Sequence, residues 1–392
     1  MELDLRTDSD ERAVILPFLF DLRADSGAWT MRIHNGEELL VADDVIATPD
    51  SFFARPPLFD PFLAGKPLSD SVITGYWYNP LRGPDYRVPF IARAGAAPRF
   101  ARASSTGTDP AGEWACRFMP GTPYEYSALG IFENDGGIVT GTFATETGDY
   151  RFLEGTTTGD SLFLSAFDGS HAYLFTAALR GDSLFGLYRS GIHSTEPWTA
   201  LRQAGFRLRD PDSLTFLKPG HNVSGLVLPD LGGHLVSPVD ARFRGHVRIL
   251  QLMGSWCSNC MDETILFNDL YRRLHPQGLD VIAIGFEKHP EPEKARAALE
   301  RYRVRMGVPY DVLYGGRAGR ESVAEQLAFL DRLMSYPTSI FIDRAGNVRR
   351  IHTGFYGPGT GKHHEAFKRE LTAFLETLLA EPAPEQAVGS LR

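Results

Sequence analysis

Two cysteines three positions apart are the residues of this chain best suited to chemistry. Cys257 and Cys260 lie in the run SWCSNC at 255–260, between an apolar segment and a segment with helical periodicity. A thiol at a helix N-terminus meets unpaired backbone N–H groups and the positive end of the helix dipole, which lower its pKa. Cys257 is therefore the predicted nucleophile, and the more buried Cys260 the thiol that resolves a mixed disulfide. Trp256 is predicted to shield one side of the pair, at an exposed helix start.

Other uses of these residues stay open. A Cys-x-x-Cys pair can be half of a tetrahedral zinc site, but no second such pair and no paired-histidine motif follows closely. A static structural disulfide is another alternative. The third cysteine, Cys116, lies between Trp114 and Phe118 and is expected to be a buried, inert thiol. His363 and His364 are interpreted as the polar start of the last helix.

The part of the chain that carries the pair alternates buried strands with amphipathic helices, which is typical of an α/β domain. Ile265, Leu266, Leu270 and Leu274 are expected to form the buried stripe of the helix that follows Cys257. The predicted strands are 247–253, 279–286, 310–314, 338–342 and 348–354. The predicted helices are 258–274, 291–306, 320–333 and 363–379.

The residues from about 14 to 209 show a different pattern, namely short runs of alternating apolar and polar residues cut by Gly and Asp turns. This alternation is typical of antiparallel β structure. A motif of an apolar residue, a glycine and an aromatic residue at period two occurs at Ile73/Gly75/Trp77, Val139/Gly141/Phe143 and Leu184/Gly186/Tyr188. A glycine between two inward-facing bulky residues allows a strand to bend, so the motif favours a closed meander barrel. A β-sandwich is the alternative.

The change of periodicity predicts a multidomain chain. We expect an all-β antiparallel, barrel-like domain at 1–212, with a break in the pattern near 95–110 where it can be subdivided. A linker at 213–222, an α/β domain at 223–380 and a flexible tail at 381–392 follow.

Composition excludes several classes of protein. With 392 residues, of which 43% are hydrophobic and 23% charged, the chain is expected to be globular. Three cysteines are too few for a disulfide-stapled scaffold. The 40 basic against 49 acidic residues give a net charge of −9, which argues against a nucleic-acid partner. No stretch reaches the roughly 18 apolar residues of a membrane helix, and the first 30 residues are acidic where a signal peptide is basic.

The residues around the cysteine pair resemble the TlpA/ResA-like branch of the thioredoxin superfamily. The resemblance rests on GHVRILQLMGSWCSNCMDE at 245–263, YPT at 336–338 and FIDRAG at 341–346, and it covers about residues 223–380. It implies a thioredoxin fold whose redox-active disulfide, Cys257–Cys260, needs no other cofactor. It also implies that Pro337, after Tyr336, is a cis-proline that presents an extended edge to substrate, and that Glu263 is the family's acidic residue.

Several positions depart from the common thioredoxin pattern. Gln251 stands six residues before Cys257, where thioredoxins have a buried Asp, and it is a neutral amide as in the TlpA-like branch. Because an amide cannot serve as the proton acceptor that the carboxylate would be, water or Glu263 must take that role. The dipeptide between the cysteines, Ser258-Asn259, lacks the common Pro, and Thr264 stands near another position where the family often has Pro. These differences leave the redox potential open.

Together these features predict a thiol-disulfide oxidoreductase that reduces disulfides of substrate proteins and receives electrons from an upstream donor. One alternative is a thiol peroxidase, although peroxiredoxin chemistry wants a Thr three residues before the reactive cysteine, where this chain has Gly254. Another is that the β half, which is similar to the amino-terminal extension of some bacterial thioredoxin-like proteins, is a binding module. The resemblance implies a periplasmic or cell-envelope location, and it leaves a lipid anchor or a cytoplasmic location open.

Overall fold

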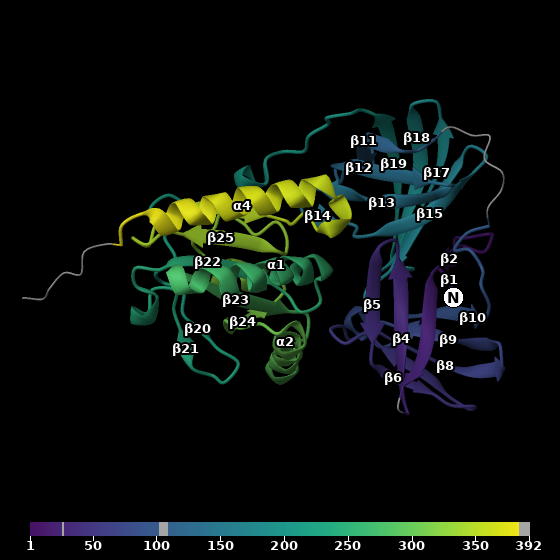
Figure 1. The fold of residues 1–392 in the computed structure, drawn as a ribbon, viewed down its shortest axis with the longest axis horizontal. Helices are drawn as coiled ribbons and strands as arrows, with labels where there is room; N and C mark the ends of the chain where they lie inside the picture. Colours follow the sequence, from purple (N-terminus) through teal and green to yellow (C-terminus); the bar gives the residue numbers. More distant parts are fainter. Residues whose placement is uncertain (26, 102–108, 384–392) are drawn as a thin grey trace, which may run out of the picture. The chain divides into compact units, whose positions relative to one another are not determined.

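The computed structural model describes residues 1–25, 27–101 and 109–383 (Figure 1). The chain divides into two compact units. The first comprises Met1–Thr145 and Asp149–Leu208, and the second comprises Glu146–Gly148 and Arg209–Arg392. The first is all β and the second α/β, so the predicted fold class is confirmed. Most of the predicted break near 95–110 and of the predicted tail at 381–392 lies outside the described residues.

Residues 1–93 of the first unit form two antiparallel sheets. A seven-stranded sheet has the order β2-β1-β10-β9-β8-β7-β6, and a three-stranded sheet has the order β3-β4-β5. The strands are β1 (Glu2–Asp4), β2 (Ile15–Pro17), β3 (Leu19–Asp25), β4 (Ala28–Asn35), β5 (Glu38–Ala42), β6 (Asp44–Ala47), β7 (Phe52–Arg55), β8 (Phe62–Ser69), β9 (Val72–Tyr78) and β10 (Arg87–Arg93). The Ile73/Gly75/Trp77 motif lies in this open sheet, so the barrel predicted from it is wrong here. Gly75 instead faces Gly65 on β8, where two glycines let the backbones approach closely.

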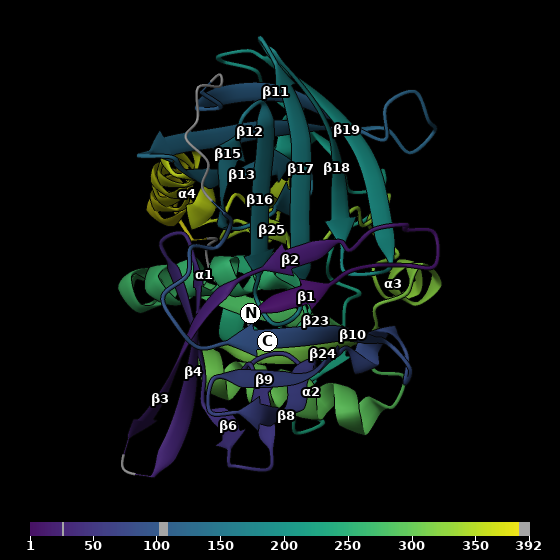
Figure 2. The same cartoon turned by 90° about the vertical axis from the view of Figure 1, so that its right-hand side faces the viewer.

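Residues 112–202 form a closed barrel of eight antiparallel strands, and a ninth, two-residue strand (β14) pairs with β13 outside the closed ring (Figure 2). The sheet has the order β12-β11-β19-β18-β17-β16-β15-β13-β14, and β12 also pairs with β13, which closes it. The strands are β11 (Gly112–Phe118), β12 (Tyr126–Asp135), β13 (Ile138–Thr145), β14 (Gly148–Asp149), β15 (Leu153–Thr158), β16 (Ser161–Phe167), β17 (Ala172–Arg180), β18 (Ser183–Ser190) and β19 (Ser194–Arg202). The predicted barrel is confirmed for this part, and the β-sandwich alternative is wrong.

Aromatic side chains fill the interior of the barrel. Phe118 stacks on Trp198 with ring centroids 6.0 Å apart, and Phe143 stacks on Phe175 at 4.5 Å. All four rings are buried, and burying one such ring contributes roughly 2–3 kcal/mol to stability. Cys116 lies in the same core, where burial raises the pKa of its thiol to about 12. The predicted burial of this thiol is confirmed.

The barrel depends on glycine where β12 and β13 close the sheet. A Cβ atom at Gly141, whose φ is +151°, would lie 1.9 Å from the backbone oxygen of Ile131 on the neighbouring strand. Gly159, in an exposed hairpin turn, also has a positive φ (+56°) but has nothing within 4 Å of such a Cβ.

We therefore predict that Gly141→Ala lowers the free energy of unfolding of the first unit by about 3 kcal/mol, because strand separation adds to backbone strain. Gly159→Ala, which introduces only the strain, should cost about 1 kcal/mol. Chemical denaturation of both variants followed by tryptophan fluorescence measures the difference. Equal losses for the two variants would contradict the role given to the close approach at Gly141.

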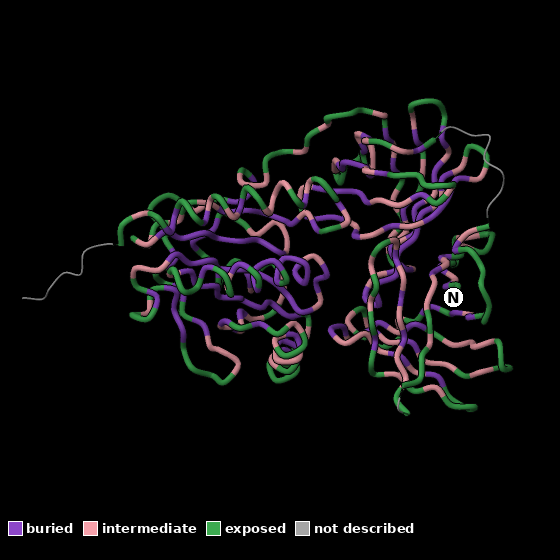
Figure 3. The backbone as a smooth tube through the Cα atoms, viewed as in Figure 1, coloured by how far each residue is buried: buried purple, intermediate pink, exposed green. Residues whose placement is uncertain are grey.

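The second unit is built on a five-stranded sheet of order β24-β23-β22-β25-β26, in which β22, β23 and β24 run parallel and β25 and β26 are antiparallel to their neighbours. Both β22 and β23 are buried along their whole length (Figure 3). The strands are β20 (Leu228–Pro229), β21 (Leu235–Val236), β22 (Val247–Met253), β23 (Leu279–Glu287), β24 (Asp311–Arg317), β25 (Thr338–Ile342) and β26 (Val348–Thr353). The helices are α1 (Ser258–Leu274), α2 (Pro292–Met306), α3 (Arg320–Gln326) and α4 (Lys362–Ala380).

Two details of the predicted elements are wrong. The helix predicted at 320–333 ends at Gln326, because Leu330 instead forms a β-bridge with Leu217. Ile265 is 56% exposed, although Leu266, Leu270 and Leu274 are buried as expected. Those three leucines are spaced by four residues, and Ile265 lies between about 100° and 180° around the helix from them. Within the described ranges, no helix is both long and apolar enough to span a membrane.

Candidate active site

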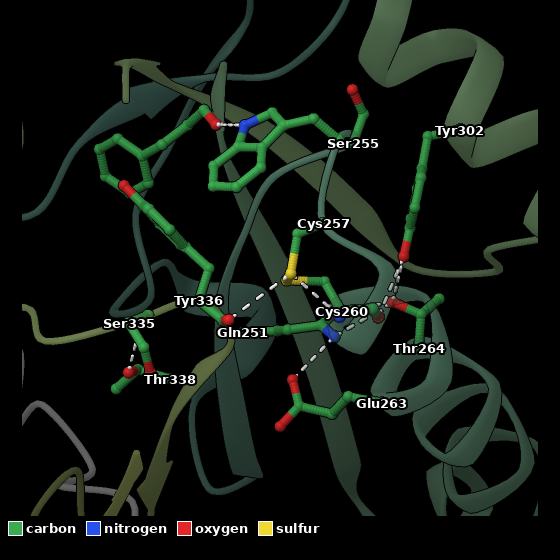
Figure 4. The surroundings of a disulfide bond; sticks show 12 residues. Gln251, Ser255, Cys257, Cys260, Glu263, Thr264, Tyr302, Ser335, Tyr336 and Thr338 are labelled. Carbon is green, nitrogen blue, oxygen red and sulfur yellow. Dashed lines mark hydrogen bonds between the residues drawn. A yellow bond between two sulfur atoms is a disulfide. The ribbon is translucent and has the colours of Figure 1, made fainter. Parts of the chain in front are cut away.

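The connection from β22 to α1 places the two cysteines at the carboxyl end of the central strand. Cys257 is the N-cap of α1, with an extended backbone conformation, and its sulfur accepts the backbone N–H of Cys260 at 3.1 Å. Cys257 and Cys260 form a disulfide with their Cα atoms 5.3 Å apart (Figure 4). The sulfur of Cys257 thus lies where the helix N-terminus can stabilise a thiolate.

The disulfide is more enclosed than the sequence suggested. Cys260 is fully buried and Cys257 is 7% exposed, so the predicted order of burial is confirmed. The expectation of an exposed pair is wrong, because the sulfur of Cys257 packs 3.5 Å from the backbone oxygen of Tyr336. The peptide bond between Tyr336 and Pro337 is cis, as the resemblance implied.

Trp256 forms a wall next to Cys257. Its indole N–H donates to the backbone oxygen of Phe286 at 3.0 Å, and its ring meets the ring of Tyr336 edge-on with centroids 5.5 Å apart. The ammonium group of Lys288 lies 3.8 Å from the centroid of the indole ring, in cation–π geometry. These contacts fix the ring in one position beside the sulfur, as expected of a residue that shields the pair.

Glu287 is a residue of this site that the sequence analysis missed. It ends β23 and is 1% exposed, and its carboxylate accepts both the backbone N–H of Ser255 at 2.8 Å and the hydroxyl of Ser255 at 2.9 Å. The loop before Cys257 is therefore held by a buried carboxylate from the neighbouring parallel strand. An acidic residue at the carboxyl end of that strand was the available signal, because ligands and active sites of parallel sheets gather at this edge.

A second buried carboxyl group, Glu263, lies one helical turn beyond Cys260. It is 0% exposed; its Oε2 accepts the amide N–H of Gln251 at 2.9 Å and its Oε1 accepts the hydroxyl of Ser339 at 2.9 Å. Burial raises the pKa of Glu263 from its ordinary value of 4.5 to about 8, against the two hydrogen bonds, which lower it. A carboxyl group with such a pKa can exchange a proton near neutral pH.

The structure therefore brings all the predicted site residues together. Gln251 on β22, Trp256 to Glu263 on the loop and α1, and Tyr336 with Pro337 before β25 lie around one disulfide. Ser339 and Tyr302 join the same buried network, and the sequence offered no motif that marks either of them.

The raised pKa of Glu263 predicts a specific pH dependence of stability. Between about pH 5 and pH 8 the unfolded chain releases this proton while the folded protein keeps it, so the free energy of unfolding should fall by about 1.4 kcal/mol per pH unit. Glu263→Gln, which cannot ionise, should lack this fall. Denaturation of the oxidised protein and the variant at several pH values measures the difference, and parallel pH profiles would contradict the burial of an ionisable proton at Glu263.

Comparison with known proteins finds relatives for the part of the chain that carries this site. Residues 219–351 match the model of the AhpC/TSA family. The chain is 27% identical over 140 residues to the thiol-disulfide oxidoreductase ResA of Geobacillus kaustophilus (strain HTA426), a match that covers 36% of this chain and 72% of that relative. The second unit is thus similar to ResA-type thiol-disulfide oxidoreductases. The predicted resemblance is thereby confirmed.

Other relatives match this chain over a similar share of its length. The thiol-disulfide oxidoreductase ResA of Geobacillus thermodenitrificans (strain NG80-2) is 26% identical over 140 residues, covering 36% of this chain and 72% of that protein. A solved structure from Chlorobium tepidum, described as a putative thiol:disulfide interchange protein DsbE, is 21% identical, with 41% of this chain and 99% of that chain covered and a TM-score of 0.31. In the present chain, the ResA-like domain follows an all-β unit of about 200 residues.

Proposed function

We propose that the chain is a thiol-disulfide oxidoreductase whose ResA-like domain reduces protein disulfides through Cys257 and Cys260. One observation carries the proposal: the sulfur of Cys257 caps α1, while the buried carboxyl group of Glu263 lies one turn beyond Cys260. The first arrangement suits a nucleophile and the second suits a proton acceptor. The names of the ResA relatives support the same activity.

In the first step, the Cys257 thiolate attacks one sulfur of a substrate disulfide. The substrate S–S bond breaks, a Cys257–substrate mixed disulfide forms, and the leaving sulfur departs as a thiolate that takes a proton from solvent. The N–H of Cys260 and the dipole of α1 stabilise Cys257 while it is a thiolate. Trp256 and Tyr336 form the walls beside it.

In the second step, Cys260 gives its proton to ionised Glu263 and attacks the Cys257 sulfur of the mixed disulfide. That bond breaks, the second substrate sulfur leaves as a thiolate and is protonated, and the Cys257–Cys260 disulfide forms. Two electrons have then passed from the enzyme dithiol to the substrate disulfide. Gln251 and Ser339 hold the carboxyl group of Glu263 in place during the transfer.

The partners follow from this cycle. The substrates are proteins with accessible disulfides, and the backbone at the cis Tyr336–Pro337 bond, next to the sulfur of Cys257, offers a place where a substrate strand can pair. An upstream thiol donor must return two electrons to the oxidised pair after each cycle. We place this chemistry in the periplasm or cell envelope, where protein disulfides persist.

A thiol peroxidase fits this site less well. The position three residues before Cys257 is Gly254, where the sequence lacks the threonine of peroxiredoxin chemistry. A Cβ atom there would lie 2.4 Å from the Trp256 indole nitrogen and 2.9 Å from the backbone oxygen of Phe286. The loop thus has no room for a threonine side chain at that position.

Reduction of insulin disulfides by the reduced full-length protein tests the proposal. We expect Cys257→Ala to abolish the activity, because the nucleophile is lost, and Cys260→Ser to accumulate a Cys257–substrate mixed disulfide that mass spectrometry detects. Cys116→Ala is the matched control and should keep the activity, since this thiol is buried in the first unit. Insulin reduction by Cys257→Ala at the parent rate would contradict the proposal.

A further inference from the structure

Behind Glu263 lies a chain of buried hydroxyl and amide groups that the proposed reaction does not yet use. Thr264, next to Glu263 on α1, has its Oγ1 3.1 Å from Nε2 and 3.2 Å from Oε1 of Gln251. The hydroxyl of Tyr302, on α2, lies 2.9 Å from Oγ1 of Thr264 and 3.1 Å from the backbone oxygen of Cys260 (Figure 4). Gln251, Thr264 and Tyr302 are at most 1% exposed.

The number of hydrogens on each group determines which way the hydrogen bonds of this network can point. A tyrosine hydroxyl has one hydrogen, a threonine hydroxyl has one, and a glutamine amide has two on nitrogen. When Tyr302 donates to Thr264, Thr264 can donate to Oε1 of Gln251, and Nε2 of Gln251 donates to Glu263. The hydroxyl hydrogens of Tyr302 and Thr264 and one N–H of Gln251 then point along the network toward the carboxyl group, which favours its ionised form. The second N–H of Nε2 lies toward Oγ1 of Thr264.

Thr264 also determines where the Gln251 amide can lie. Without its hydroxyl, Oε1 of Gln251 would lose the hydrogen bond that Thr264 donates, in a fully buried setting. A buried carbonyl oxygen that has lost its donor is costly, so the amide would turn or shift toward another partner. A turned amide would present its oxygen to Glu263, and such an arrangement is favourable only when Glu263 carries its proton.

We propose that Thr264 and Tyr302 are positioning residues for the resolving step, which hold the Gln251 amide against Glu263 and so keep this carboxyl group able to take the proton of Cys260. The proposal rests on the proposed function, because it assumes that Glu263 accepts this proton. The sulfur of Cys257 meets the backbone N–H of Cys260 and the backbone oxygen of Tyr336, so the attack on substrate should not depend on Thr264 or Tyr302.

Two buried tyrosines near Glu263 hold their protons tightly. Burial raises the pKa of Tyr302, with smaller contributions from the negative charges of Glu263, Asp262 and Glu287. Burial likewise raises the pKa of Tyr310, which faces Glu263 from the start of the β24 region. Both tyrosines thus remain protonated near neutral pH, so neither of them exchanges a proton with Glu263 there.

Stopped-flow reaction of the reduced full-length protein with 5,5′-dithiobis(2-nitrobenzoate) separates the two steps, because each releases one coloured thiolate. We expect the rate of the second release to rise with the ionisation of Glu263. Thr264→Val should move the midpoint of this rise up by about one pH unit, equal to a roughly tenfold slower second step at pH 7. Tyr302→Phe should shift it in the same direction, Thr264→Ser should restore it, and the first release should be unchanged in all three.

Two controls keep the outcomes distinguishable. Tyr271→Phe removes a hydroxyl from the far end of α1 and should leave both steps as in the parent protein. Glu263→Gln tests the underlying proton transfer: a second step with the parent pH profile in this variant would overturn the role of Glu263 in the proposed function. A changed profile in Glu263→Gln together with a parental profile in Thr264→Val and Tyr302→Phe would overturn the positioning role alone.

Discussion

Placing a charge in the interior of a protein costs free energy. In the proposed reaction, the first two turns of α1 carry a negative charge first on Cys257 and later on Glu263. The N–H of Cys260 and the positive end of the helix dipole stabilise the negative charge on the sulfur of Cys257. Hydrogen bonds from Gln251 and Ser339 stabilise the negative charge on Glu263, but they only partly offset the rise in pKa that burial causes. The balance leaves a carboxyl group whose pKa of about 8 lies near neutrality.

The sheet of the second unit brings the groups around the disulfide together from distant parts of the chain. The parallel strand β22 supplies Gln251 and leads into the cysteine loop, and β23 supplies Glu287, which holds that loop through Ser255. The antiparallel strand β25 brings Ser339 to the other side of Glu263. Since β22 and β23 are buried throughout, each of their polar side chains has at least one hydrogen-bond partner.

Much of this arrangement follows from local sequence. The limits of α1 were predictable because a capping cysteine and a regular leucine spacing both mark them. The role of Glu263 came from the family resemblance, and its burial was not visible in its own neighbourhood of the sequence. Glu287, Ser339 and Tyr302 lie 24 or more residues beyond Glu263 and reach the site only through sheet register and helix packing, so no spacing rule could identify them. The extent of the barrel was overestimated because the glycine motif at Gly75 serves close strand approach instead of closure.

The reduction potential of the Cys257–Cys260 couple is the most direct test of the central claim, that the stabilised thiolate and the buried carboxyl group serve a disulfide reductase. Equilibration of the full-length protein with glutathione or dithiothreitol buffers at pH 7, read by thiol alkylation and mass spectrometry, gives this value. A reductase should have a potential near that of thioredoxin, about −270 mV. A potential near that of the strong oxidant DsbA, about −120 mV, would contradict the claim and reverse the direction of electron flow.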